Sequence, residues 1–293
     1  MNLVLTVLQV VTPVFALAAI GFGWVRAGYA YDIAFVTRLT MTLSVPCLIF
    51  VALMETEADP VALATLLAAS VVSYGIVGAV FAGVVAVTGL ERRTFLAPLI
   101  FGNTGNVGLP LALFAFGREG LGLAVVVFAV MAVGSFTIGI RLVAGAGSMG
   151  RVLREPMVGA TLAGALFLWA GWTTPPAITE TLRLTGQMAI PLMLLTLGVA
   201  IARLQTRGIG RAIALSALKA GVCVSVAAGV GLAFALPPVA FAVLVLQIAT
   251  PVAVTSYMLA EKYGADAQSV AALVVASTVM AVGLLPLILA SVL

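Results

Sequence analysis

The sequence predicts an all-α integral membrane protein, and both its composition and the spacing of its charges favour that class. Of the 293 residues, 63% are hydrophobic and only 8% are charged, whereas an ordinary soluble domain has about 25% charged residues. The 14 Lys and Arg and 10 Asp and Glu residues are too few for the charged surface of a soluble fold. Almost the whole chain is therefore expected to lie in or next to a lipid bilayer.

Charged and turn-forming residues divide the chain into apolar runs, and a transmembrane helix needs about 20 apolar residues. These runs predict ten transmembrane helices, at 3–25, 31–54, 61–89, 93–116, 119–143, 156–173, 178–202, 211–236, 238–260 and 266–292. The first run carries no charge before Arg26, so it is interpreted as a helix that is retained rather than a cleavable signal peptide. Pro237 and Pro238 supply the turn between the eighth and ninth helices, because proline cannot continue a helix.

The distribution of basic residues predicts which way the helices face. Loops after odd-numbered helices hold ten Lys or Arg residues, and loops after even-numbered helices hold two, Arg118 and Arg183. Because basic loops stay on the cytoplasmic side, both termini are expected outside or in the periplasm, in a multi-pass protein of the cell (inner) membrane. The net charge of +4 follows from this bias, so it gives no support to nucleic-acid binding.

Prolines indicate that the chain is doubled. Four of them in the first half recur after 140–145 residues, with Pro13, Pro46, Pro98 and Pro110 matching Pro156, Pro191, Pro238 and Pro251. The pattern predicts two five-helix repeats, at 1–143 and 156–293, joined by a cytoplasmic linker at 144–155. Because five is odd, the second repeat enters the membrane from the opposite side, as in the inverted repeats of secondary transporters.

Two polar interruptions, placed in the fourth and ninth helices, are the strongest functional signal. Residues 101–110 read FGNTGNVGLP and residues 247–257 read QIATPVAVTSY, both at mid-membrane. Such segments break the helical hydrogen bonding, which a bilayer tolerates only where protein or trapped water satisfies the backbone. Paired broken helices expose half-helix ends that bind ions or substrates. The substrate-binding candidates are Asn103, Thr104, Asn106, Thr250, Pro110 and Pro251.

Further polar residues near the membrane interior are candidates for ion or substrate contacts: Ser135, Thr137, Gln187, Gln247, Arg38 and Lys219. Arg38 and Lys219 either extend toward the cytoplasmic side or attract an anion on its path. Neither break contains Asp or Glu, which disfavours cation–proton antiport. Sodium coupling through neutral oxygens remains open, with Asn106, Ser135 and Gln247 as its candidates.

Catalysis is disfavoured by the absence of His, since imidazole is a common base and metal ligand. Cys47 and Cys223 lie in apolar runs, where packing is the simpler role. We therefore expect that the protein is not an enzyme and that it binds no cofactor other than, in the coupled alternative, a sodium ion.

The sequence resembles the auxin efflux carrier family, which includes plant PIN-formed auxin carriers and bacterial malonate and malate permeases. The matching segments are 43–50, 102–111, 191–198, 250–253 and 260–264. The resemblance implies a fold similar to the bile acid sodium symporters and to sodium–proton antiporters, with broken helices four and nine crossing. It also implies a scaffold of helices one, two, six and seven, and a core of the other six. The chain lacks the long hydrophilic loop of plant members, so their phosphorylation control is not implied.

Together these observations predict a secondary-active transporter of small organic anions such as auxin-like acids, malonate or malate. Efflux by elevator-type alternating access is the favoured mechanism, because an inside-negative potential drives anions outward without a coupling ion. Two alternatives remain open: a sodium-coupled symporter of bile-acid type, and a substrate-sensing receptor. The expected partners are the organic anion, the lipid bilayer and, more weakly, a second copy of the chain.

Overall fold

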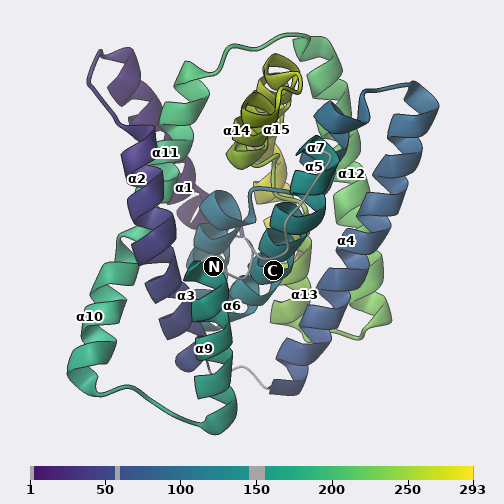
Figure 1. Ribbon diagram of the computed structural model, residues 1–293. Helices are drawn as coiled ribbons and strands as arrows, with labels where there is room; N and C mark the ends of the chain where they lie inside the picture. Colours follow the sequence, from purple (N-terminus) through teal and green to yellow (C-terminus); the bar gives the residue numbers. More distant parts are fainter. Residues whose placement is uncertain (1–2, 57–59, 145–155, 293) are drawn as a thin grey trace.

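The computed structural model describes residues 3–56, 60–144 and 156–292, and it folds them almost entirely into helices (Figure 1). Within these ranges the β structure consists of one isolated antiparallel bridge between Gly102 and Val252. The all-α prediction therefore holds for the described residues. Apart from Ala144, the predicted linker at 144–155 lies outside them.

In the first half, several helices continue into one another through five-residue π-helical segments. The elements are α1 (Leu3–Arg26), α2 (Ile33–Leu39), η1 (Thr40–Ser44), α3 (Val45–Met54), α4 (Pro60–Thr88), α5 (Arg92–Ile100), η2 (Thr104–Gly108), α6 (Leu109–Gly134), η3 (Ser135–Gly139) and α7 (Ile140–Ala144). Gly117, at φ 63° and ψ −149°, divides α6 near the predicted turn between the fourth and fifth helices.

The second half has the elements α9 (Pro156–Ala170), α10 (Pro176–Gln187), α11 (Ala189–Arg203), α12 (Ile209–Ala233), α13 (Pro238–Ile248), α14 (Val254–Tyr263) and α15 (Ala267–Val292). Every range predicted as a helix contains helical structure. Among the described residues, seven helical segments are long and apolar enough to cross a membrane, and 156–170 and 238–248 are shorter apolar helices. The count of ten crossings stays a prediction.

The helices pack in two groups. In one, α1 lies along α11, and α3 packs against α9 and α10. Glycines bring α1 and α11 together: a side chain at Gly198 would overlap the carbonyl oxygen of Ala18, and one at Gly21 would overlap that of Leu195. In the other group, α4, α6, α12, α13 and α15 pack against one another, as the right half of Figure 1 shows in part.

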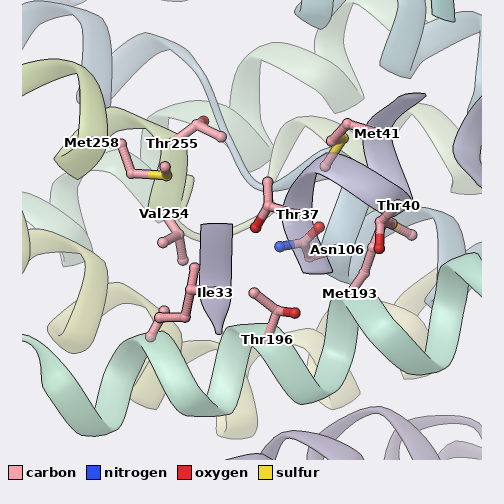
Figure 2. A pocket seen from close by; sticks show the side chains of 11 residues that line it. Ile33, Thr37, Thr40, Met41, Asn106, Met193, Thr196, Val254, Thr255 and Met258 are labelled. Carbon is pink, nitrogen blue, oxygen red and sulfur yellow. The ribbon is translucent and has the colours of Figure 1, made fainter. Parts of the chain in front are cut away.

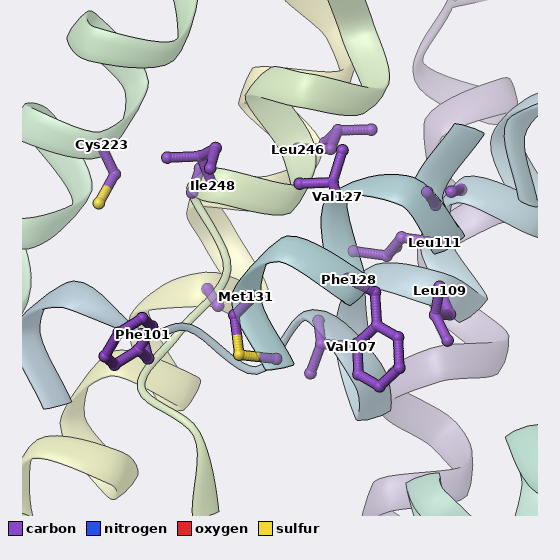
Figure 3. Packing of buried hydrophobic residues seen from close by; sticks show 14 of the residues in the cluster. Phe101, Val107, Leu109, Leu111, Val127, Phe128, Met131, Cys223, Leu246 and Ile248 are labelled. Carbon is purple, nitrogen blue, oxygen red and sulfur yellow. The ribbon is translucent and has the colours of Figure 1, made fainter. Parts of the chain in front are cut away.

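Large apolar side chains occupy both the interior and the outside of the molecule. Figure 3 shows buried residues that surround the broken helices, among them Phe101, Leu109 and Ile248. In contrast, Trp169 is 83% exposed and Val87 is 89% exposed. An aqueous surface would not favour such residues in number, so the outward-facing apolar side chains agree with a lipid environment.

Candidate functional site

The two polar segments predicted to break helices do so. The chain leaves helical geometry after Ile100, where Phe101 adopts an extended conformation (φ −94°, ψ 121°), and helix resumes at Thr104. The second break separates α13, which ends at Ile248, from α14, which begins at Val254. Both breaks fall inside the sequences 101–110 and 247–257.

The breaks cross each other in contact. The backbone N–H of Asn103 donates to the carbonyl of Pro251 at 2.7 Å, next to the bridge between Gly102 and Val252. The N–H of Val252 donates to the Ser277 hydroxyl at 2.9 Å. Backbone groups released by the breaks are thus bonded within the protein, as the membrane interior requires.

Two glycines allow this close approach. A Cβ atom at Gly102 would overlap Thr250 Oγ1, and one at Gly108 would overlap the side-chain amide of Gln247. Both contacts join the first polar segment to the second. Glycine is therefore required at these two positions because the second polar segment approaches closely, and not because of an unusual backbone angle.

A cavity of about 530 Å³ lies on one side of the crossing. Its lining includes the residues where helix resumes after each break, namely Asn103, Gly105 and Asn106 before and within η2, and Ala253, Val254 and Thr255 at the start of α14. The first N–H groups of a helix have no partner within it and carry a partial positive charge. Two such ends facing one cavity favour an anionic group there.

The rest of the cavity wall is mainly apolar and includes side chains from α6, η3, α9 and α14. Thr37 and Ser135 add hydroxyls, and Glu261 and Lys262 supply one charge of each sign near the end of α14. The apolar lining consists of Met41, Phe128, Met131, Ala132, Phe136, Met157, Met258 and Leu259. The cavity therefore combines one polar end with a broad apolar surface.

A smaller recess of about 40 Å³ shares part of this wall (Figure 2). Here α2, η1 and α11 face the two broken helices. Its polar residues are Thr37, Thr40, Asn106, Thr196 and Thr255, and its apolar ones include Met193 and Met258. Thr40 is 2% exposed, and its hydroxyl has no hydrogen-bond partner.

The opposite side of the crossing faces Lys219. This residue of α12 shares a cavity of about 10 Å³ with Thr250, Pro251 and Ser277, close to the carbonyl end of α13. Lys219 is 2% exposed, and Nζ contacts Cys223 Sγ at 3.6 Å. The expectation that Lys219 extends toward the cytoplasmic surface is wrong, because its side chain is enclosed by α12, α15 and the second break.

Thr250 and Pro251 lie on this same side, away from the large cavity. The Thr250 hydroxyl donates to the Gln247 carbonyl at 2.7 Å, and its Oγ1 faces Gly102. Thr250 and Pro251 line the small cavity beside Lys219 and not the large one, so their contact with the substrate stays a prediction. Of the predicted site residues, Asn103, Asn106 and Ser135 line the large cavity.

Thr104 and Gln247 are buried, and neither lines the cavity or the recess. The Thr104 hydroxyl and both polar atoms of the Gln247 side chain have no hydrogen-bond partner. Because Gln247 packs against Gly108, it does not share one space with Asn106 and Ser135. These three residues, predicted as sodium ligands, do not surround a single site.

Pro110, predicted as a substrate-binding residue, lies after the break and lines neither the cavity nor the recess. It lies at the start of α6, directly after η2, whereas the non-helical backbone spans Phe101 to Asn103. Proline is tolerated at a helix start because its missing N–H would be unpaired there. The predicted match of Pro110 with Pro251 therefore does not relate the two breaks.

Three remaining candidates also lie outside the cavity and the recess. Arg38 is exposed on α2, and the Thr137 hydroxyl donates to the Val133 carbonyl in its own helix. Gln187 lines a separate cavity of about 170 Å³ with Arg118, Arg183 and Glu55. There Glu55 forms ion pairs with both arginines, which join α3 to α6 and α10.

Sequence reasoning missed most of the residues that α2, η1 and α11 contribute, namely Thr37, Thr40, Met41 and Thr196. A signal was present, since Thr37, Thr40, Thr42 and Ser44 place four hydroxyls within one membrane-length run. Of these, Thr37 and Thr40, three residues apart, share the helix face that meets the site.

Comparison with known proteins agrees with this geometry. The family model described as "Membrane transport protein" matches residues 6–152 and 147–289, which together cover nearly the whole chain. No curated protein matches the chain. The matched ranges contain both broken helices and the cavity between them. The chain thus belongs to the membrane transport protein family, the family of the auxin efflux carriers, and is a membrane transporter.

Proposed function

We propose that the protein is a secondary carrier that exports small organic anions through the cavity beside the crossing. The observation that carries this proposal is that residues at the helix starts after both breaks, Asn103, Gly105 and Asn106 at one and residues 253–255 at the other, line one cavity. Their N–H groups offer partial positive charge without a fixed cationic side chain. Such a site binds a carboxylate and can also release it.

We infer further that the preferred substrate has one carboxylate and an apolar body. Phe128, Met131, Phe136 and Met258 line the cavity, and its one basic residue, Lys262, follows the acidic Glu261. A second carboxylate would be buried among these apolar side chains without a cation, which costs several kcal/mol. Aromatic or alkyl monocarboxylates should therefore be preferred over malonate and malate.

The proposed mechanism is alternating access between two inverted five-helix repeats. We assign α1–α3 and α9–α11 to the scaffold and the broken helices with α4, α12 and α15 to the moving core. The two packing groups support this division. If the basic loops lie inside, as predicted, the cavity wall at Met157 and Lys262 lies toward the cytoplasm, and we assign the structure to an inward-facing state on this basis.

We propose that the membrane potential drives export and that no ion is coupled to it. An inside-negative potential is worth about 2.3 kcal/mol per charge per 100 mV, which drives a monoanion roughly fortyfold uphill at about 1.4 kcal/mol per decade. The buried Lys219 supports this inference, because its amino group lies where the carbonyl end of α13 would attract a cation.

The test is flux from proteoliposomes loaded separately with phenylacetate, indole-3-acetate, malonate or malate, with potential and sodium gradient set independently. We expect monocarboxylate efflux that follows the potential and ignores sodium. Asn106→Leu should abolish it, whereas Thr137→Val, outside the cavity, should leave it unchanged. Flux only with a sodium gradient would support a symporter, and binding without any flux would support a receptor.

A further inference from the structure

The recess between the two groups of helices contains a buried hydroxyl with no partner. Thr40 Oγ1 lies in η1, is enclosed in protein and makes no hydrogen bond. Leaving a buried hydroxyl unpaired costs about 1–3 kcal/mol. A group that binds only during transport would supply the missing partner.

The buried hydroxyls of Thr40, Thr104 and Thr278 have no hydrogen-bond partner, and of these three threonines Thr40 lines the recess. A helical threonine commonly donates to the carbonyl four residues before it, and Thr42, Thr65, Thr88, Thr161 and Thr181 all do so. Thr42 belongs to the same π-helical segment as Thr40, yet only Thr42 is bonded in this way. The Thr40 hydroxyl is left free on the side that lines the recess.

The neighbours of Thr40 suit an anionic group. Asn106 and the start of α14, at Val254 and Thr255, line the same recess from the broken helices. On the other wall, Thr196 accepts from or donates to the Tyr31 hydroxyl at 2.7 Å, which holds its side chain in place. No Asp, Glu, Lys or Arg lines the recess as described, so its selectivity comes from hydrogen-bond donors and the helix ends.

We propose that Thr40 is a substrate-binding residue: its hydroxyl donates a hydrogen bond to the carboxylate of the transported anion, which Asn106 and the first N–H groups of α14 hold from the other side. This inference rests on the proposed function. Because Thr40 lies in η1, between the scaffold helices α2 and α3, and Asn106 lies in η2 of the core, the bound carboxylate joins the proposed scaffold to the proposed core. The recess then binds the head group, and the apolar cavity beside it binds the body of the substrate.

Thr40→Val provides the test, because valine keeps the shape and removes the hydroxyl. A hydrogen bond to a charged group contributes about 1.5–3 kcal/mol, so we expect the KM for phenylacetate efflux to rise about ten- to hundredfold. Thr40→Ser should restore most of the affinity. Thr42→Val, whose hydroxyl bonds its own helix, is the matched control and should transport normally.

The melting temperature separates this role from a structural one. If the hydroxyl only stabilised the fold, Thr40→Val would melt lower, whereas removal of an unpaired hydroxyl should leave the melting temperature unchanged or raise it. Phenylacetate should raise the melting temperature of the wild type and not that of Thr40→Val. Equal shifts and equal KM values in both would refute the assignment of Thr40. Absence of binding and flux by the wild type with all four acids would instead refute the proposed function.

Discussion

Gly102 offers the sharpest test of the crossing, because Gly102→Ala inserts one methyl group between the two broken helices. The new Cβ would overlap Thr250 Oγ1 and lie 3.0 Å from the Thr250 carbonyl oxygen and 3.3 Å from its Cβ. Overpacking of this kind costs about 1–3 kcal/mol. Separation of the segments would also weaken the bond from the Asn103 N–H to the Pro251 carbonyl, worth about 1 kcal/mol.

The expected total of about 2–4 kcal/mol corresponds to a fall of roughly 3–7 °C in melting temperature, measured on purified protein by intrinsic fluorescence. Thr250→Ala removes the overlapping oxygen, so the double variant should be more stable than the sum of the two single effects. Gly75→Ala is the control, since a Cβ there meets nothing within 4 Å. An unchanged melting temperature for Gly102→Ala, or strictly additive effects in the double variant, would refute the contact.

Three further predictions follow from groups outside the cavity. Lys219→Met should raise the melting temperature, because it removes a buried amino group that forms no ion pair among the described residues. The same variant should lower efflux in the proteoliposome assay. A lower melting temperature would contradict the first expectation. The pKa of Asp266 is lowered by hydrogen bonds from the Ser269 hydroxyl and backbone N–H, so its stabilisation is present above about pH 4 and is lost as the pH falls through the lowered pKa. Asp266→Ala should therefore lower the free energy of unfolding by about 1 kcal/mol at neutral pH. The melting temperature of the variant should also fall less than that of the wild type as the pH is lowered. The same dependence of melting temperature on pH in both proteins would count against this. Glu55→Gln should weaken both arginine pairs and open the cavity of about 170 Å³ that these residues line, which faster labelling of a cysteine placed at Leu121 by an impermeant maleimide would detect; an unchanged rate would show that these pairs do not close it.

The sequence predicted the helices and the two breaks because the relevant signals are local. Glycine, asparagine and proline inside an apolar run indicate a helix break regardless of which other helices that run packs against. Proline alone located one break less well, since Pro110 begins a helix while the extended backbone lies at Gly102 and Asn103. Which side of the crossing a side chain faces is not determined by its neighbours in the sequence.

Thr250 illustrates this limit. Its place next to Asn103 and Asn106 was predicted from matching segments, but its side chain faces Gly102 and the Lys219 cavity. Thr40 was missed for a related reason, since the recess needs α2, α11 and α14 together, and these are far apart in the chain. Which face of each broken helix meets the site depends on packing between helices that sequence spacing does not report.

The three π-helical segments of the described chain all contribute to the cavity or the recess, through Thr40 and Met41, Gly105 and Asn106, and Ser135 and Phe136. A π-helical turn holds one more residue than an α-helical turn, so the residues after it are displaced by one position, about 100°, from the α-helical periodicity of the residues before it. The binding surface is thus set by the phase of each helix as well as by residue identity. A single-residue deletion within η1 would keep the composition of the helix nearly unchanged, yet it would remove the π-helical turn that carries Thr40 and Met41. Insertions and deletions of one residue at these three places are therefore the changes by which a carrier of this architecture could acquire a differently shaped site.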